Sequence, residues 1–451
     1  MDDFTKLLNK YDHPVPRYTS YPTVPYWSES PSSEDWLASL DNSLKSKESS
    51  WSMYVHIPFC ETLCSFCGCN TSITRNKSRG EDYVKILLKE WDNYKSKIPQ
   101  FSKRPLKQIH LGGGTPNFLS SESFKKLLLP IMQDCNIDKK EFEASIEVDP
   151  RRCTIEQLET LAELGFNRIS IGVQDFNLEV QKLINRVQSY EKVKMVTEAS
   201  RHLGMPSVNF DLIYGLPKQS MELFKNTIEQ TISLKPDRIA LYSLAIVPWI
   251  KPSQKLFKDE DLPMGADKRA LYEYAREQFL AEGYIEIGMD HFALPTDSLA
   301  VSVSDKTLHR NFMGYTCKKS DVLLGLGVSS ISETTDCFHQ NEKVLTLYQE
   351  KVEKSETATL RGHKLNPDDI YYRNKVMEFM TQLEVGLDDE KQTADVKQFL
   401  QEMIDDKLVE VASGKLKLTE KGHPFIRNAC LVWDQRLRQK KPDAKTFSKS
   451  I

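Results

Sequence analysis

The 451-residue chain lacks a long apolar run, a strong net charge and any repeated or low-complexity segment. No stretch approaches the roughly 18 apolar residues that a membrane-spanning helix needs. The segment Met1–Tyr11 is charged and has no apolar centre of the kind found in secretory signals. The 61 Lys and Arg residues nearly balance 64 Asp and Glu, which argues against a general nucleic-acid binder. We therefore expect a cytoplasmic, monomeric protein that binds neither membrane nor nucleic acid.

The overall composition is that of a globular protein. Hydrophobic residues make up 39% and charged residues 28%, which excludes a disordered or fibrous chain. The length allows two or three domains and a core that needs no disulfide bonds. Nine cysteines are therefore notable, because a reducing compartment disfavours structural disulfides.

Six short β-prone segments alternate with helical patterns between about residue 50 and residue 250. Such alternation predicts βαβ units and a parallel sheet, as a barrel or an open doubly wound sheet. In either case, ligands gather at the carboxyl ends of the strands, where polar and glycine residues occur in this sequence. The predicted strands are Met53–His56, Gln108–Leu111, Ala144–Val148, Ile169–Val173, Val208–Ile213 and Ile239–Leu244.

The flanking regions have different patterns. Prolines in the first 50 residues predict loops and short helices. Gly288–Ser332 reads as a glycine-punctuated loop region, and the chain from Asp368 reads as helices with a hairpin near 408–418, like a small winged helix. We divide the chain into an N-terminal extension over the barrel mouth (1–50), a barrel with a cysteine loop (51–332) and a mostly helical C-terminal domain (333–451).

Four cysteines lie on one short loop. They are spaced C-x3-C-x2-C-x-C, at Cys60, Cys64, Cys67 and Cys69. Zinc sites usually gather two separated ligand pairs, and no second pair stands nearby. One compact loop suits an iron–sulfur cluster better, since thiolates are the preferred ligands of such clusters. The alternatives are ligand-free thiols or a structural zinc ion.

A C-x3-C-x2-C loop after a first strand resembles the radical S-adenosylmethionine enzymes. The resemblance implies an α/β fold, a partial (β/α)6 barrel, in which Cys60, Cys64 and Cys67 bind a 4Fe-4S cluster. It also implies that the cofactor's methionine part chelates the free iron, and that one electron then releases a 5′-deoxyadenosyl radical. Phe66 fits the aromatic position that packs on adenine.

Further motifs resemble the oxygen-independent coproporphyrinogen III oxidases, also called coproporphyrinogen dehydrogenases. The resemblance implies that two propionates of coproporphyrinogen III are oxidatively decarboxylated to vinyls, giving protoporphyrinogen IX. It also implies two S-adenosylmethionine molecules and an electron donor such as a flavodoxin or ferredoxin system. The motifs are Pro16–Thr23, Tyr54–Pro58, Gly68–Asn70, Gly112–Pro116, Ser145–Pro150, Gly172–Phe176, Asn185–Arg186, Asp211–Pro217, Gly288–Phe292, His309–Phe312, Gly325–Val328 and Arg427–Asn428.

The matched positions divide between the two cofactor molecules. No general base is required, so we expect no catalytic side chain. The resemblance assigns Tyr54, Gly113, Glu147 and Ile331 to the cluster-bound molecule. It assigns Phe66, Gly114, Thr115, Gln174, Arg186, Asp211 and Ala245 to the second molecule.

Elementary chemistry adds expectations of its own. N–H groups in the turn Gly112–Gly114 can meet a ligand carboxylate. Asp211 lies in an apolar strand and needs a ligand or an arginine partner. The substrate's four carboxylates favour cations at the cavity mouth, with Arg17, Lys251 and His291 as candidates. Two tyrosines in Pro16–Thr23, Tyr18 and Tyr21, suit stacking on a flat macrocycle.

Two matters remain open at the level of sequence. The role of Cys69 is not assigned by the three-ligand pattern. A haem-binding chaperone of the same superfamily is the alternative function, although such relatives usually lack both a cysteine at position 69 and the segment Pro16–Thr23.

The chain departs from the family pattern at one position. In the Ala245 segment many family members have a histidine where this chain has Ile246.

Overall fold

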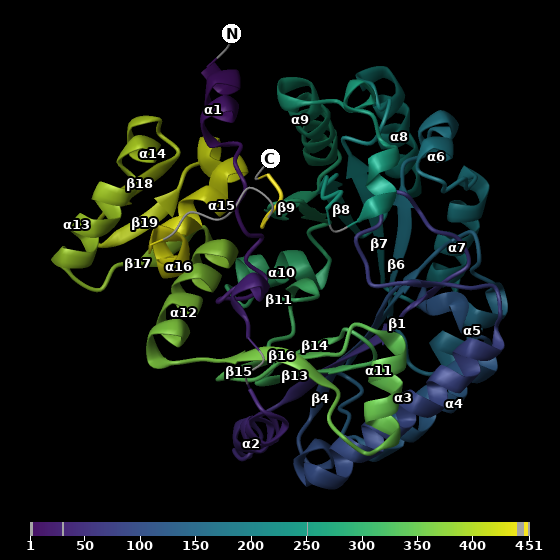
Figure 1. Ribbon diagram of the computed structural model, residues 1–451. Coiled ribbons are helices and arrows are strands. Elements are labelled where there is room, and N and C mark those ends of the chain that lie inside the picture. The colour runs from purple at the N-terminus through teal and green to yellow at the C-terminus, as the bar shows by residue number, and fades with distance from the viewer. Residues whose placement is uncertain (1–2, 29–30, 250, 440–445, 450–451) are drawn as a thin grey trace.

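A twelve-stranded sheet organises the computed structural model, which describes residues 3–28, 31–249, 251–439 and 446–449 (Figure 1). Six parallel strands pair in their order along the chain, without the reversal that marks a doubly wound sheet. The predicted α/β fold with a parallel core is therefore confirmed, and its curved, open sheet is that of a partial barrel. These strands are β1 (Trp51–Ile57), β4 (Leu106–Gly113), β5 (Glu143–Val148), β6 (Arg168–Gln174), β7 (Ser207–Tyr214) and β8 (Arg238–Ser243).

Helices cover the outer face of the parallel strands. Five of the six predicted strands lie within observed ones, the sixth (Ile239–Leu244) runs one residue past the end of β8, and helices follow the strands as the pattern predicted. The helices are α3 (Ser78–Lys97), α4 (Ser121–Asp134), α5 (Ile155–Glu163), α6 (Leu178–Leu183), α7 (Tyr190–His202), α8 (Met221–Leu234) and α9 (Gly265–Ala281). Among the described residues, no helix has the length and apolarity to cross a bilayer.

The region 288–332 is more regular than the loop that we predicted. It contains β13 (Val322–Leu326), a seventh parallel strand that pairs with β1 on the side opposite β4. The glycines of this segment hid the strand in the sequence. The region also holds β10 (His291–Ala293), α10 (Ser298–Ser304), β11 (His309–Asn311) and β12 (Gly314–Thr316); β9 (Ile285–Gly288) precedes it.

The sheet continues beyond residue 332 through antiparallel strands. Residue 332, at which we divided the barrel from the C-terminal unit, lies within β14 (Ile331–Glu333). The next strands, β15 (Cys337–Asn341) and β16 (Thr359–Lys364), extend the same sheet, with α11 (Leu345–Glu353) between them. The three-part division stays a prediction.

A second hydrophobic core joins the two ends of the chain. Tyr18 and Tyr21, each 1% exposed, are buried in it together with side chains of the C-terminal helices. The expectation that these two rings face a macrocycle is therefore wrong for this structure. The backbone amide of Val15 donates to the carbonyl of Ser448 at 3.3 Å, and α1 (Asp3–Tyr11) lies against the C-terminal elements in Figure 1.

The C-terminal elements combine helices with a small three-stranded sheet. The predicted hairpin is present, and both residues of its turn, Ser413 and Gly414, have positive φ angles of 52° and 71°. Two positive φ angles are what a two-residue hairpin turn of type I′ requires. The N-terminal helices are α1 (Asp3–Tyr11) and α2 (Ser33–Ser43). The C-terminal elements are α12 (Pro367–Gln382), β17 (Glu384–Gly386), α13 (Glu390–Phe399), α14 (Gln401–Asp405), β18 (Val409–Ala412), β19 (Lys415–Leu418), α15 (Ile426–Ala429) and α16 (Gln435–Gln439).

A buried carboxylate on α3 fastens the sheet extension to the barrel. Glu90 accepts hydrogen bonds from the amide of Gly327 at 2.7 Å, from Asn341 at 2.6 Å and from the Tyr348 hydroxyl at 2.6 Å. Burial raises the pKa of Glu90 to about 7, against the effect of these three donors. The Gly325–Val328 motif is thus explained in part by this contact at the end of β13.

Removing this carboxylate should destabilise the fold strongly. Glu90→Ala leaves three buried donors without an acceptor, each at a cost of about 1–3 kcal/mol, so we expect a loss of about 3 kcal/mol or more. The measurement is urea unfolding followed by tryptophan fluorescence. Glu122→Ala, at the surface of α4 where Glu122 pairs with Lys126, is the matched control and should keep the wild-type midpoint. Equal midpoints for both variants would refute the anchoring role.

Candidate functional site

A cavity of ≈ 460 Å3 lies at the carboxyl ends of the parallel strands. The cysteine loop forms part of its wall, and most of the residues singled out from the sequence face it. The predicted residues that line it are Cys60, Cys64, Cys67, Phe66, Gly113, Gly114, Thr115, Glu147, Gln174, Arg186, Asp211 and Ala245, and Cys69 is with them. The structure thus brings together positions that span almost two hundred residues of sequence.

The thiols of the loop differ in pKa because they differ in hydrogen bonding and burial. The Cys69 thiol donates to Cys67, which lowers the pKa of Cys67 to about 6 and raises the pKa of Cys69 well above its ordinary value. Burial raises the pKa of Cys60 to about 11, and its Sγ lies 3.2 Å from the Thr115 hydroxyl. Cys67 therefore ionises more readily than Cys60 or Cys69, and the Cys69 amide also donates to its sulfur at 3.4 Å.

Two guanidinium groups lie beside Cys64. Arg186 Nη1 and Arg151 Nη2 are 3.6 and 3.8 Å from Cys64 Sγ, and both arginines pair with Asp149. The Cys64 sulfur therefore lies within reach of two cations that are themselves held by one carboxylate. Among the described residues, no three His, Cys, Asp or Glu side chains converge on a single-ion position. A cluster does not need such convergence, because each thiolate binds a different iron.

Neighbouring segments hold the loop in place, since the loop itself has little regular structure. Backbone and side-chain atoms of Ser65 donate to the carbonyls of Ile184 and Leu183, both at 3.1 Å. From the other side, Gln254 donates to the carbonyl of Phe66 at 3.1 Å, and Lys251 donates to that of Cys69 at 2.7 Å. The ammonium of Lys251, expected at a substrate carboxylate, thus supports the loop instead.

The glycine turn accommodates the protein's own side chains. A Cβ at Gly113, whose φ is +116°, would lie 2.7 Å from the His56 ring, and one at Gly114 would lie 3.1 Å from Cys60 Sγ. The amides of Gly113 and Gly114 donate to Glu147 Oε2 at 3.2 Å and to the carbonyl of Ile57 at 2.8 Å. Contrary to our expectation, the N–H groups of Gly113 and Gly114 are engaged within the protein, and close packing explains why glycine stands at both positions, which still line the cavity.

Glu147 presents a carboxylate to the cavity. Its side chain is 45% exposed, and Oε1 lies 3.3 Å from Nε2 of His110, whose Nδ1 contacts the Ser145 hydroxyl at 2.7 Å. Partial desolvation inside the cavity would raise the pKa of Glu147, but hydrogen bonds from His110 and the Gly113 amide outweigh it and lower that pKa. Glu147 is therefore an ionised acceptor in the neutral range, able to bind an ammonium group or hydroxyls.

Within the described part of the chain, Asp211 has no arginine partner, contrary to one of our two expectations. Its carboxylate accepts from the Ser170 hydroxyl at 2.8 Å and from the Asn209 amide at 3.0 Å. Burial raises its pKa to about 6, and the charge of Glu147 adds to this effect. Two neutral donors leave the carboxylate available to a ligand, which is the other expected partner.

Gln174 adopts the left-handed backbone conformation, with φ of +66°, where β6 bulges away from β7. The bulge turns its side chain into the cavity. Tyr54 and Ile331 are not among the lining side chains of the described chain. Tyr54 donates to His56 Nδ1 at 3.0 Å behind the glycine turn, and Ile331 lies on β14, where its carbonyl faces Gly325.

A regular pattern that we did not use predicts much of the remaining lining. On each inner strand, every second residue faces the cavity and is often polar, while the residues between are apolar and pack under the helices. Counting by two from Glu147 finds Ser145 and Asp149, and counting by two from Asp211 finds Asn209. The same alternation on β4, β6 and β8 gives the others. The missed lining residues include Gln108, His110, Ser145, Asp149, Arg168, Ser170, Asn209 and Tyr242.

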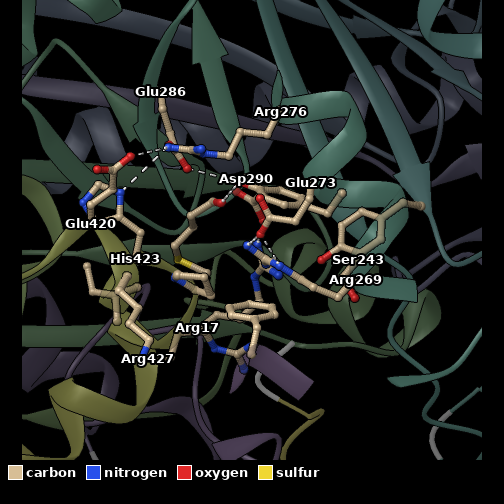
Figure 2. A pocket seen from close by; sticks show the side chains of 17 residues that line it. Arg17, Ser243, Arg269, Glu273, Arg276, Glu286, Asp290, Glu420, His423 and Arg427 are labelled. Carbon is tan, nitrogen blue, oxygen red and sulfur yellow. Dashed lines mark hydrogen bonds and ion pairs between the residues drawn. The ribbon is translucent and has the colours of Figure 1, made fainter. Parts of the chain in front are cut away.

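A second cavity of ≈ 470 Å3 lies where the barrel, the N-terminal segment and the C-terminal unit meet (Figure 2). Ser243 lines both cavities. Ion pairs dominate the second one. Figure 2 shows Arg269 beside Glu273, and Arg276 beside Glu286 with Nε to Oε2 at 2.7 Å. Its acidic and basic side chains thus largely neutralise one another.

Asp290 connects the two cavities. One of its oxygens pairs with Arg17 in the second cavity, and Oδ1 lies 2.6 Å from Nδ1 of His291, which lines the first. Burial would raise the pKa of Asp290, but Arg17 and His291 outweigh it and hold the pKa well below its usual range. Asp290 therefore orients a guanidinium and an imidazole at the inner edge of the cavity.

Comparisons with known proteins give one consistent result. A model of the radical SAM superfamily matches residues 54–231. The oxygen-independent coproporphyrinogen III oxidase of Escherichia coli strain K12 is 39% identical over 443 residues, 96% of this chain and 95% of its own. That of Helicobacter pylori strain J99 is 36% identical over 459 residues, 100% and 99% of the two chains. The solved structure of Escherichia coli coproporphyrinogen III oxidase, described as a radical SAM enzyme, has a TM-score of 0.88 at 38% identity, covering 93% and 98%.

The loop geometry predicts different outcomes for the four cysteines. Replacing Cys60, Cys64 or Cys67 by Ala should abolish an oxygen-sensitive cluster, because each would supply one thiolate. Cys69→Ser should retain the iron, since its thiol serves Cys67 as a donor, while turnover falls. Iron and sulfide analysis with visible spectra after anaerobic reconstitution measures both. Full iron retention in all three Ala variants would overturn the assignment, and iron loss in Cys69→Ser would make Cys69 a ligand.

Proposed function

The chain belongs to the family of oxygen-independent coproporphyrinogen III oxidases, which are radical S-adenosylmethionine enzymes, and we propose that its barrel cavity holds the reacting groups. The enzyme is an oxidoreductase of haem biosynthesis. It converts two propionates of coproporphyrinogen III to vinyls, giving protoporphyrinogen IX. The observation that carries the proposal is the meeting of three loop cysteines, Glu147 and Asp211 in one cavity, in a chain that matches its relatives over nearly its whole length.

The side chains present fit a 4Fe-4S cluster and S-adenosylmethionine. Cys60, Cys64 and Cys67 would hold the cluster from one loop, with Arg186 Nη1 3.6 Å from the Cys64 sulfur. When bound, the pair supplies the adenosyl radical that removes hydrogen from a propionate β-carbon. The remaining task of the chain is to orient the cofactor, to bind carboxylates and to keep water out.

The division of the cofactor contacts follows the matched positions. We assign Tyr54, Gly113, Glu147 and Ile331 to the cluster-bound molecule, with Glu147 as the acceptor for its ammonium group. Tyr54 and Ile331 would act at the edge, because their side chains do not line the cavity. A second molecule would use Asp211 and Arg186, together with Phe66, Gly114, Thr115, Gln174 and Ala245.

The group formed by Arg17, Asp290 and His291 would bind the carboxylates of the substrate. His291 faces the cavity between the rings of Tyr242 and Tyr315, at centroid distances of 5.7 and 5.4 Å. Arg17 comes from the N-terminal extension, which supports the proposal that this segment completes the substrate site. Guanidinium and imidazole donors suit propionate carboxylates at the edge of a macrocycle.

The absence of disulfide bonds among the nine cysteines, all of which the structure describes, bears on the cellular compartment. The nine cysteines are free in the structure, which suits a reducing compartment, and we place the enzyme in the cytoplasm as a monomer. The electron that starts each turnover would come from a flavodoxin or ferredoxin system.

Anaerobic turnover tests the function directly. The cluster-loaded chain, given coproporphyrinogen III, S-adenosylmethionine and dithionite, should release two CO2 for each protoporphyrinogen IX formed and consume S-adenosylmethionine. Chromatography of the oxidised porphyrins and of 5′-deoxyadenosine measures this, with Cys64→Ala as the inactive control. Tight haem binding without CO2 release would instead support the chaperone alternative.

Binding of the second cofactor molecule should weaken in mild acid. The pKa of Asp211 is about 6, so the carboxylate that a cationic or hydroxyl-bearing ligand needs is lost as the pH falls through that value. Between pH 7.5 and pH 5.5 we expect a roughly four-fold rise in Kd for one of two molecules, by linkage.

The other molecule serves as an internal control, because Glu147 has a lowered pKa and stays ionised over this range. Anaerobic calorimetry at both pH values resolves the two sites, and Asp211→Asn should leave one pH-independent site. If wild type binds only one molecule, or if Asp211→Asn keeps the pH dependence, Asp211 does not hold the second cofactor.

A further inference from the structure

Three cations from separate segments meet outside the barrel cavity, beside the last cysteine of the loop. Lys251, which follows β8, donates to the carbonyl of Cys69 at 2.7 Å. The carbonyl of Lys343, which follows β15, accepts from the side-chain amide of Asn70 at 3.0 Å. Arg361 on β16 is near enough for its charge to act on Lys343, as the charge of Lys251 does. We call Lys251, Lys343 and Arg361 the rim cations, and none of them lines either cavity.

The rim carries positive charge that the described residues do not neutralise. The stretches that form it contain the three cations and one acid, Glu342; they are residues 69–70, 251–254, 340–343 and 360–362. Glu342 is only 12% exposed and pairs with Lys351 at 2.7 Å. No carboxylate of the described chain pairs with a rim cation.

The charges that act on Lys343 are both positive. Burial lowers the pKa of Lys343, and the charges of Arg361 and Lys251 lower it further. Burial likewise lowers the pKa of Arg361, without a carboxylate to oppose the effect. Like charges held together in this way favour an anionic ligand, which would relieve their repulsion.

The strand register places Arg361 on the face of the sheet that leads back to the barrel. Ile331 on β14 lies opposite Gln340 on β15, and Gln340 lies opposite Arg361 on β16. Directly opposite residues project from the same face, so Arg361 stands two strands, about 10 Å, from Ile331. Its Nε donates to Gln340 Oε1 at 2.9 Å, and Gln340 Nε2 donates to the carbonyl of Ser329 at 3.1 Å. The guanidinium is therefore held over β15, and its two terminal amino groups make no hydrogen bond to a described residue.

The rim lies at the opposite end of the sheet from Arg17 and His291. The order of the strands runs from β16 at one end to β10 and β9 at the other, and His291 is on β10. The segment between α1 and α2 reaches both ends, because Ser28 and Gly362 on β16 exchange backbone hydrogen bonds at 3.1 and 2.9 Å (Figure 1). Cations therefore stand at both ends of the open sheet, as a ligand with carboxylate arms on several sides requires.

We propose that Arg361 and Lys343 bind the propionates of the tetrapyrrole that are not decarboxylated, with the charge of Lys251 beside them. The proposal rests on the proposed function and adds a specificity site to it. Two of the four propionates survive the reaction, so their charge is available for binding at every step. Guanidinium and ammonium groups are the usual partners of such carboxylates. Binding that is equal in the ground state and the transition state affects KM rather than kcat.

Removing the two rim charges should therefore raise KM selectively. For Lys343→Gln/Arg361→Gln we expect the KM of coproporphyrinogen III to rise about ten-fold or more, with kcat changed less than about three-fold. The measurement is anaerobic turnover of the cluster-loaded enzyme with dithionite. The control Lys354→Gln/Lys364→Gln removes two exposed charges next to α11 and at the end of β16, and should keep the wild-type KM. Lys343→Arg/Arg361→Lys should recover most of the loss.

A binding experiment separates charge from shape. The probe is mesoporphyrin IX, which has ethyl groups at the two reacting positions and keeps the other two propionates; its diamide has the same shape without the charge. Fluorescence titration of the cluster-loaded enzyme should give a Kd for the diacid about ten-fold or more higher in Lys343→Gln/Arg361→Gln than in wild type. The diamide should bind the two proteins with Kd values that agree within about two-fold.

These readouts distinguish failure of the rim site from failure of the function. If wild type does not decarboxylate coproporphyrinogen III, the proposed function is refuted. If wild type does so and the double variant has the same KM, the rim does not bind substrate and the proposal is overturned. It is overturned equally if the diamide loses as much affinity as the diacid, because the effect is then one of shape. Should the double variant load less iron than wild type, Arg361→Gln alone is measured in the same way, with a rise in KM of about three-fold expected.

Discussion

The need to pair buried charge inside the barrel governs much of this structure. Inner strands carry polar residues at every second position, and their registers bring these residues side by side in layers. At the base of the cavity, Gln108 Nε2 donates to Glu143 at 2.6 Å, and Arg168 pairs with the same carboxylate at 3.2 Å. Burying such groups unpaired would cost several kcal/mol each, so the register of neighbouring strands is fixed by their partners as well as by backbone hydrogen bonds.

The cysteine loop depends on that framework, because it contributes little regular structure itself. Its backbone is held by the turn after α6, by Gln254 and by the glycine turn that follows β4. Three separate crossover connections must therefore be in place before the thiols face one cavity. The buried Glu90 has the same function at the other edge, where it fixes the end of β13 against α3.

The sequence predicted the parallel strands and most of the cavity lining, because hydrophobic segments and strand-end motifs are local signals. It did not predict β13, because glycines such as Gly325 are typical of loops. In the structure Gly325 is a strand residue, and glycine is needed there because a Cβ would lie 2.6 Å from the carbonyl oxygen of Ile331. The partners of Asp211 were also missed, since Ser170 and Asn209 are unremarkable singly and meet the carboxylate only through the register of β6 and β7. Tyr18 and Tyr21 were misplaced because a core shared by the two ends of a chain leaves no local pattern.

The distribution of charge explains how one cavity can accept a cationic cofactor and an anionic substrate. Near the cysteines, the carboxylates of Glu147 and Asp211 pair with no arginine among the described residues, and the nearby Arg186 pairs with Asp149. Toward the second cavity the order is reversed. Asp290 pairs with both Arg17 and His291. The remaining N–H groups of these two side chains can therefore donate to an anionic ligand. In the proposed function this distribution would favour a sulfonium at the first end and propionates at the second, and repulsion would disfavour each ligand at the other's place.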